Sequence, residues 1–226
     1  MRNEIEIIKS AFKKPLPGIV VQRTMSPSVR FTGDIKHNMH KARTSSVLIL
    51  LYKKAGKWNV PFILRTTYDG AHSGQISLPG GKTEEWDISL LDTALRESEE
   101  EIGVKRNSIN FICELTPLYI PNSNFMVYPQ VCITNQEPRF IPDCREVDSI
   151  IEASVTELLS PATIHRFCRN INDIQVDAPY YKIGKHVIWG ATAMIMSEFL
   201  YLLKDVSLFT SLQSHSYNAY SAPECQ

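Results

Sequence analysis

The sequence lacks a net charge, a paired set of cysteines and a long apolar run, and each absence excludes a class of protein. Its 24 lysines and arginines balance its 24 aspartates and glutamates, so no basic field indicates a nucleic-acid partner. The five cysteines are scattered without a C-x-x-C pair, which is typical of reduced thiols. No segment approaches the ~20 apolar residues of a membrane span, and no signal peptide follows Met1. We expect a cytoplasmic protein with no membrane or nucleic-acid partner.

The apolar pattern of the 226 residues predicts one domain with extensions. A short amphipathic helix over residues 3–14 and a lead-in segment are expected within residues 1–42, and a disordered tail within 205–226. Between them, strands are expected at residues 45–51, 58–65, 72–78, 111–118 and 127–134, with a hairpin at 180–189 and an apolar helix over 190–204. This order of elements fits an α/β fold in which a mixed sheet lies between helices.

An unusual density of acids follows Arg96, because four of the next five residues are glutamates. Positions three and four apart on a helix are neighbours, so Glu97, Glu100 and Glu101 share one face, where they repel each other by roughly 0.2–0.5 kcal/mol per pair. Such a face suits a hard divalent cation such as Mg²⁺ or Mn²⁺, which prefers oxygen ligands. The competing interpretation is a solvated acidic helix end.

The surroundings of this acidic helix favour the cation site. Gly80 and Gly81 allow a sharp turn that approaches a ligand closely, and Gly103 supplies the left-handed residue of a helix end. Acids near Asp87 are expected at the positive start of the helix. A buried stripe beside the acidic face is predicted for Ile88, Leu91, Leu95, Ser98 and Ile102.

Residues 96–104, reading R-E-S-E-E-E-I-G-V after the Gly80-Gly81 turn, resemble the signature of the Nudix hydrolases. The resemblance implies a Nudix-type α/β/α sandwich over residues 43–204 and hydrolysis of a nucleoside diphosphate derivative. It also implies metal ligation by Glu97, Glu100, Glu101 and the Gly81 carbonyl, with Arg96 anchoring the glutamates by ion pairs. The first half of the signature departs from the pattern, and one extra residue restores the register, with Gly81 as the turn glycine and Asp87 in place of the usual glutamate.

The segment upstream of the turn resembles the extra motif of the coenzyme A pyrophosphatase branch of the same family. Arg65 precedes His72-Ser73-Gly74-Gln75 by seven residues, although Gly70 stands where a second arginine is usual. This resemblance implies that Arg65, His72 and Gln75 bind coenzyme A or its thioesters, which are split into 3′,5′-ADP and 4′-phosphopantetheine. The alternative for His72 and Gln75 is a structural role in fixing their loop by hydrogen bonds.

Three questions stay open at the level of the sequence. The substrate could instead be ADP-ribose, NADH or another nucleoside diphosphate derivative, and a regulator that binds a nucleotide without cleaving it is a further alternative. Glu146 and Glu152 are both candidates for the base that deprotonates the attacking water. The pair His37-x-x-His40 is expected to lie in a surface loop rather than to hold a metal, and a homodimer is possible.

Overall fold

A mixed sheet forms the centre of the structure, a computed structural model that describes residues 2–28, 39–67, 74–171 and 174–210. It has eight strands with the order β3-β2-β1-β7-β5, while β4 pairs with β1, β6 with β7 and β8 with β2. The longest strand, β1 (Arg43–Lys54), pairs in parallel with β7 (Phe125–Thr134) and antiparallel with β2 (Lys57–Arg65). The other strands are β3 (Ile76–Ser77), β4 (Gly80–Lys82), β5 (Ile109–Glu114), β6 (Leu118–Ile120) and β8 (Val147–Ser154).

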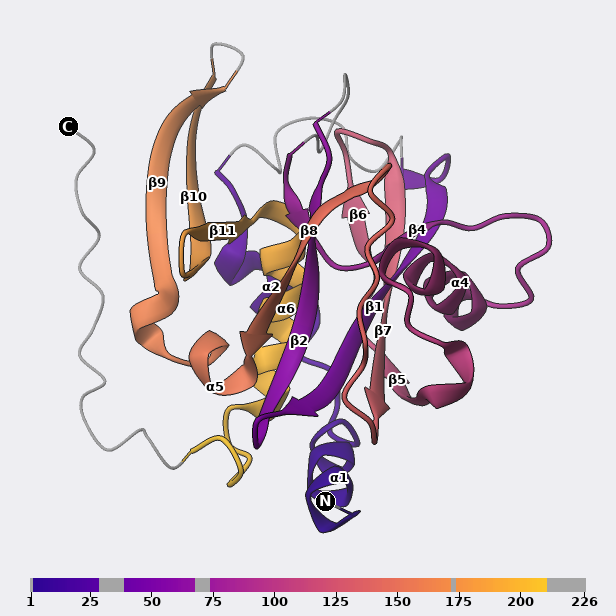
Figure 1. Cartoon of the computed structure of the whole chain (residues 1–226). Helices are drawn as coiled ribbons and strands as arrows, with labels where there is room; N and C mark the ends of the chain where they lie inside the picture. The colour runs from indigo at the N-terminus through magenta and orange to yellow at the C-terminus, as the bar shows by residue number, and fades with distance from the viewer. Residues whose placement is uncertain (1, 29–38, 68–73, 172–173, 211–226) are drawn as a thin grey trace.

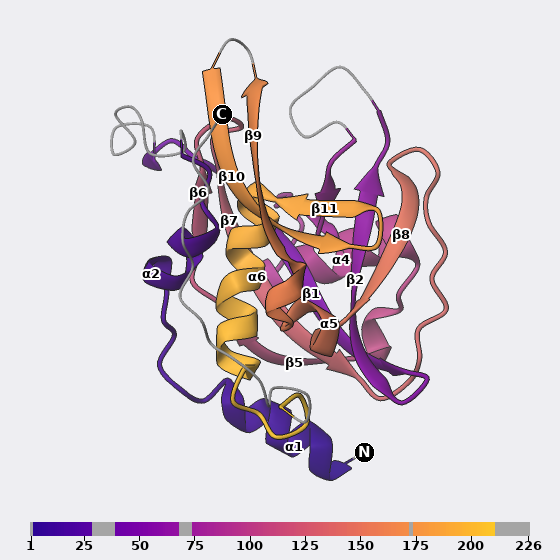
Figure 2. The same cartoon turned by 90° about the vertical axis from the view of Figure 1, so that its left-hand side faces the viewer.

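Two long helices cover opposite faces of this sheet. Helix α4 (Leu90–Ile102) lies on one face and helix α6 (Gly190–Leu203) on the other (Figure 1), and the view turned by 90° shows α6 in front of the strands and α4 behind them (Figure 2). The expected α/β/α sandwich with a mixed sheet is therefore confirmed. None of the helices in the described ranges is long and apolar enough to cross a membrane.

The core explains why β1 is apolar at every position from Leu48 to Tyr52. Side chains alternate between the two faces of a strand, and both faces of β1 are covered. Leu48 and Leu50 pack in the cluster under α4, whereas Ile49 and Leu51 pack in the larger cluster under α6. All four side chains are fully buried, so each contributes roughly 1.5–3 kcal/mol of apolar burial.

The N-terminal segment is part of this core rather than a separate lead-in. Helix α1 (Arg2–Ala11) buries Ile5 and Ile8 in the cluster under α6, and the ring of Phe12 stacks on that of Phe199 at 5.7 Å. The predicted helix is confirmed. The sequence pattern did not predict the two short helices that follow, α2 (Ile19–Gln22) and η1 (Arg23–Met25).

A buried carboxylate joins this segment to the opposite end of the chain. Glu198 on α6 is fully buried, and its oxygens accept hydrogen bonds from the amide nitrogen of Gly18 (3.0 Å), from Nε2 of Gln22 (2.8 Å) and from Oγ1 of Thr116 (2.7 Å). The predicted boundary at residue 42 therefore does not separate two structural units.

A second, three-stranded sheet follows the main one. It consists of β9 (Ile164–Ile171), β10 (Ile174–Ile183) and β11 (His186–Trp189), in the order β11-β10-β9, and it contacts β3 and the start of α6. The hairpin of β10 and β11 was predicted, but β9 was not. The segment between the sheets holds α5 (Val155–Leu158) and η3 (Pro161–Thr163), and η2 (Arg106–Ser108) precedes β5.

The predicted start of the tail at residue 205 is wrong. Val206 is 7% exposed and Phe209 is 4% exposed, and both belong to the cluster under α6. Their apolar side chains hold residues 205–209 against the domain. Residues 211–226, which were expected to be disordered, lie outside the described residues.

Candidate active site

Both ends of α4 are set by local hydrogen bonds. The helix begins after Ser89, whose hydroxyl accepts a hydrogen bond from the amide of Asp92 (3.0 Å), and it ends at Gly103, which has the left-handed φ of 72°. The predicted end is confirmed, but the start at Asp87 is wrong. Ile88 lies before the helix and is 91% exposed, so it is not part of the buried stripe.

Arg96 binds three carboxylates at once. Its Nε and Nη2 donate to the two carboxylate oxygens of Asp87 at 2.8 and 3.0 Å, while Nη1 donates to Glu97 (2.8 Å) and to Glu100 (3.2 Å). The side chain of Asp87 is fully buried, and the bidentate contact with Arg96 lowers the pKa of that carboxyl far below its usual range. Asp87 thus occupies the place that the restored register predicted.

The glycine turn lies directly against these carboxylates. Gly81 pairs with Ser46 of β1, and a Cβ atom at Gly81 would overlap the carboxylate of Glu97. Gly80 has a φ of 144°, and a Cβ atom there would overlap the backbone of Ser46 and Val47. Gly80 therefore needs to be glycine, whereas a side chain at Gly81 would displace the carboxylate of Glu97.

Glu101 is the most deeply buried of the three glutamates on the acidic face. Its side chain is 3% exposed, one oxygen accepts the amide hydrogen of Gly80 (2.8 Å), and the other lies 3.5 Å from Nη1 of Arg65. Burial raises the pKa of Glu101 to about 8, the contacts with Gly80 and Arg65 oppose the shift, and Glu97 and Glu146 add to it. Burial likewise raises the pKa of Glu97, against the lowering effect of Arg96.

This donor set fits a divalent cation by its chemistry. In the described part of the chain no three His, Cys, Asp or Glu side chains converge as a preformed ligand group, because Arg96 holds Glu97 and Glu100. Ionisation of Glu101 is nevertheless unfavourable at this buried position. A nearby cation would stabilise the ionised carboxylate. Glu100 is 60% exposed, so its carboxylate can exchange partners at little cost.

The three predicted substrate-binding residues, Arg65, His72 and Gln75, differ in their surroundings. Arg65, at the end of β2, reaches Glu101, and its buried Nε has no hydrogen-bond partner among the described residues. The carbonyl of Gln75 accepts the amide hydrogen of Arg65 (3.1 Å), while Gln75 itself lines a pocket against the second sheet. His72 lies outside the described residues.

The two candidate bases differ clearly in position. The charge of Glu146 raises the pKa values of both Glu97 and Glu101, so this exposed carboxylate lies near the cluster. The carboxylate of Glu152 accepts the hydroxyl hydrogen of Tyr52 and pairs with Lys54 at 2.7 Å. Lys54 is eight residues along β1 from Ser46, the partner of Gly81, or roughly 26 Å at the rise of a strand. Of the two, the geometry favours Glu146.

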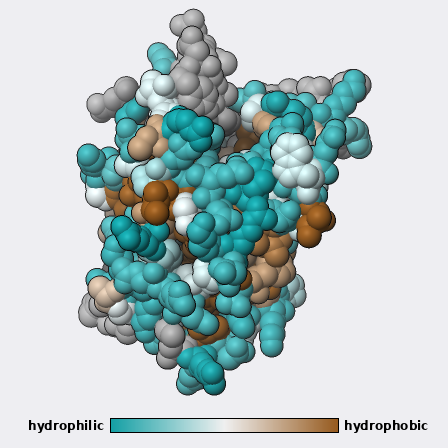
Figure 3. Space-filling model, turned by 45° about the vertical axis from the view of Figure 1, so that its right-hand side comes forward, coloured by the Kyte–Doolittle hydropathy of each residue, from teal (hydrophilic) through white to brown (hydrophobic). Residues whose placement is uncertain are grey.

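Two other features of this side of the molecule bear on the site. Figure 3 shows the side that carries α4 as mainly hydrophilic, with small separate hydrophobic patches, as expected for a site that binds a charged ligand. His40, one member of the His37-x-x-His40 pair, is exposed. The other member, His37, lies outside the described residues. The expectation of a surface loop there stays a prediction.

Comparison with known proteins identifies the family. A family model described as the NUDIX domain matches residues 42–166, more than half of the chain. The chain belongs to the Nudix family. It is therefore a Nudix hydrolase, an enzyme that acts on the diphosphate linkage of a nucleoside diphosphate derivative, as the signature at Arg96–Val104 implied.

Relatives of this Nudix hydrolase come from several kingdoms. It is 30% identical over 164 residues to the mitochondrial coenzyme A diphosphatase NUDT8 of Homo sapiens, covering 71% of this chain and 69% of that protein. It is also 30% identical to the Nudix hydrolase NudL of Photorhabdus laumondii, over 57% of this chain and 68% of the relative. Nudix hydrolase 22, chloroplastic, of Arabidopsis thaliana is 31% identical over 86% of this chain and 63% of its own length. Among solved structures, a MutT/nudix family protein from Enterococcus faecalis has a TM-score of 0.48 at 15% identity, over 77% of this chain and 71% of its own.

Proposed function

We propose that this Nudix hydrolase splits the diphosphate linkage of coenzyme A or its thioesters, giving 3′,5′-ADP and 4′-phosphopantetheine or its acyl form. The observation that carries the proposal is the position of Arg65. The strand that ends at Arg65 leads into the His72-Ser73-Gly74-Gln75 motif, and the guanidinium of Arg65 lies beside Glu101. Similarity to a relative named as a coenzyme A diphosphatase supports this choice of substrate.

The residues of the site have different roles in the proposed reaction. Glu97, Glu100 and Glu101, with the Gly81 carbonyl, would hold Mg²⁺ or Mn²⁺, which when bound neutralises phosphate charge and lowers the pKa of a water molecule. Arg96, fixed by the buried Asp87, keeps Glu97 and Glu100 on the acidic face of α4.

Arg65 and Glu146 act on the substrate side of the cluster. The side chain of Arg65 is 23% exposed, so its guanidinium can donate to a phosphate oxygen, and arginine suits such contacts because it binds oxyanions with two parallel hydrogen bonds. Glu146 is exposed and lies next to Val147, which pairs with Arg65, so its carboxylate can accept a proton at the mouth of the site.

The proposal is tested by the products formed from a small substrate panel. The purified protein is incubated with coenzyme A, acetyl-coenzyme A, ADP-ribose or NADH in the presence of Mg²⁺ or Mn²⁺, and products are identified by mass. We expect 4′-phosphopantetheine and 3′,5′-ADP from coenzyme A. Cleavage of ADP-ribose or NADH alone would overturn the choice of substrate and leave the chemistry of the acidic helix in place.

A matched pair of variants tests the assignment of the glutamates. Glu100→Gln removes a proposed ligand and should lower turnover by at least ~100-fold. The control is Glu99→Gln, the same change on the same helix, where Glu99 pairs with Lys105 and Arg106 instead of Arg96. Near-wild-type turnover in Glu100→Gln would contradict the assignment, since the control isolates any general effect of losing a charge from α4.

A further inference from the structure

A second site is formed between the main sheet and the second sheet. A pocket of about 310 Å³ lies between the segment that leads into β3, where Gln75 is found, and the strands β9 and β11. Two cationic residues, Arg169 and Lys185, line it together with His186 and with Phe167 and Trp189. The residues that line it come from two parts of the chain that are about 90 residues apart, 64–76 and 167–189.

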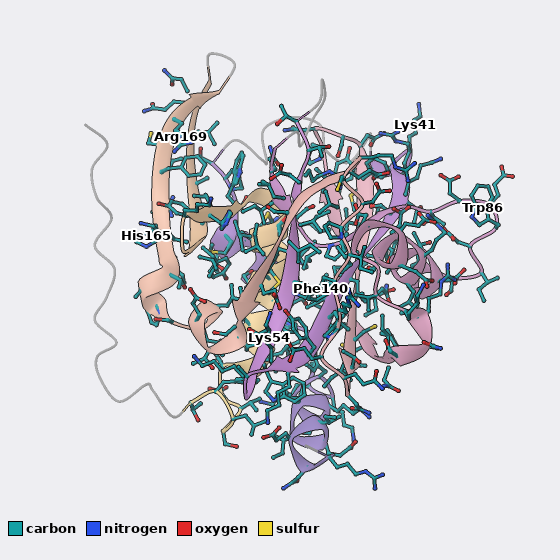
Figure 4. All side chains as sticks on the ribbon, viewed as in Figure 1. Lys41, Lys54, Trp86, Phe140, His165 and Arg169 are labelled. Carbon is teal, nitrogen blue, oxygen red and sulfur yellow. The ribbon has the colours of Figure 1, made fainter. Side chains whose placement is uncertain are left out.

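The aromatic residues form one wall of the pocket. The rings of Phe167 and Trp189 meet edge to face at 5.3 Å, and the guanidinium of Arg169 lies over the ring of Phe167 at 5.2 Å. Figure 4 shows Arg169 on β9, on the opposite side of the molecule from Trp86, which precedes α4. A wall of this kind offers π-faces to a planar base, and such stacking contributes ~1–3 kcal/mol per base.

The charge of the pocket has one sign. No aspartate or glutamate lines it, and neither Arg169 nor Lys185 has an acidic partner among the described residues. The acid nearest in the register of this sheet, Asp177, is already held by Arg166 at 2.6 Å. Cationic side chains without acidic partners favour an anionic ligand, and phosphate is the anion that arginine and lysine bind best.

The pocket is connected to the active site through β2. Leu64 lines the pocket, and the next residue, Arg65, reaches Glu101. Because neighbouring side chains of a strand point to opposite faces, the pocket and the acidic cluster lie on the two sides of the end of β2. The hydrogen bond from Arg65 to the carbonyl of Gln75 holds the two sites together. A substrate that occupied both sites would pass around this strand end.

We propose that this pocket binds the nucleotide end of the substrate, an adenine base that carries a phosphate monoester on its ribose. The base stacks on the wall of Phe167 and Trp189, and Arg169 and Lys185 bind the phosphate. The pantetheine end of coenzyme A is uncharged and offers no anionic group for Arg169 and Lys185 to bind. The inference rests on the proposed function, since it assigns one half of the proposed substrate to a place in the fold.

Binding without turnover tests the pocket independently of catalysis. Affinities for adenosine 3′,5′-bisphosphate and for AMP are measured by calorimetry on the whole protein with EDTA present. We expect the bisphosphate to bind about tenfold more tightly than AMP, and Arg169→Ala or Lys185→Ala to abolish this preference, as expected for the loss of a charge-assisted contact. The matched control is Arg166→Ala, because Arg166 lies on the other face of β9 and pairs with Asp177.

Kinetics give the second readout. With coenzyme A as substrate, Arg169→Ala should raise KM about tenfold and leave kcat unchanged, while the KM for dephospho-coenzyme A, which lacks the ribose phosphate, should not change. Equal affinities of wild type and both pocket variants for the bisphosphate would overturn the pocket assignment. Failure of the wild type to cleave coenzyme A would instead overturn the proposed function, and the binding preference would still decide the pocket.

Discussion

Replacing Glu101 by glutamine should make the metal-free protein more stable at alkaline pH. Glu101 is almost completely buried, and the groups that face it are Arg65 on β2, Glu97 on α4, the amide of Gly80 and Glu146. Two of these are acids, and the single cation lies 3.5 Å away, so the charged form of Glu101 is poorly compensated. Glutamine has a side-chain oxygen that can still accept the amide hydrogen of Gly80. The substitution removes the negative charge of residue 101.

The size of the effect follows from the pKa of Glu101, which is about 8 against a reference of 4.5. A raised pKa means that the folded state binds more protons than the unfolded state, so the free energy of unfolding falls as pH rises from about 4.5 to about 8. Each unit of difference corresponds to about 1.4 kcal/mol, so the loss reaches a few kcal/mol at pH 8.

Urea denaturation with EDTA, measured between pH 5 and pH 8.5, checks this expectation. The wild type should lose stability across the range, and Glu101→Gln should lose much less, while Mn²⁺ should stabilise the wild type and have little effect on the variant. Glu99→Gln is the control for a lost charge on α4. Parallel pH profiles of the wild type and Glu101→Gln would refute the electrostatic account of the cluster.

Three further changes test other parts of the structure. Arg65→Lys should raise the KM for coenzyme A by about tenfold, because lysine cannot make the paired hydrogen bonds of arginine; an unchanged KM would remove Arg65 from the substrate site. Glu146→Gln should lower kcat by ~100-fold or more, as expected for loss of a general base, whereas Glu152→Gln should retain activity; the reverse result would exchange their roles. Glu198→Ala should lower the free energy of unfolding by about 3 kcal/mol or more, since several buried donors lose their acceptor, and urea denaturation with an unchanged midpoint would contradict this.

The sequence predicted those parts of the structure that local patterns determine. The strand at Leu48–Tyr52 and the helix ending at Gly103 follow from apolar periodicity and a helix-terminating glycine. The signature predicted ion pairs between Arg96 and the glutamates, whereas the pairing of Arg96 with Asp87 was found only in the structure. Strand β9 was missed because most of its described side chains are exposed, so it has no continuous alternation of apolar and polar residues.

The parts that could not be predicted depend on contacts between distant segments. Spacing alone could not show that Glu146 lies near the acidic cluster while Glu152 is held by Lys54, because β8 brings the two acids to different ends of the sheet. No sequence pattern indicated the pocket lined by Arg169 and Lys185 either. Its residues come from four segments, which the packing of the second sheet against β2 and β3 brings together.

The link between Gln22 and Glu198 has a consequence for the order of events during synthesis. These residues are 176 positions apart, and Phe199 of the same late helix packs in one cluster with Ile5 and Ile8 of α1. At the ~5–20 residues per second of translation, roughly 10–40 s pass between the synthesis of Ile5 and Ile8 and the completion of α6. For that time the nascent chain exposes a hydrophobic helix that a chaperone can bind, and the sandwich closes only when almost all of its elements exist.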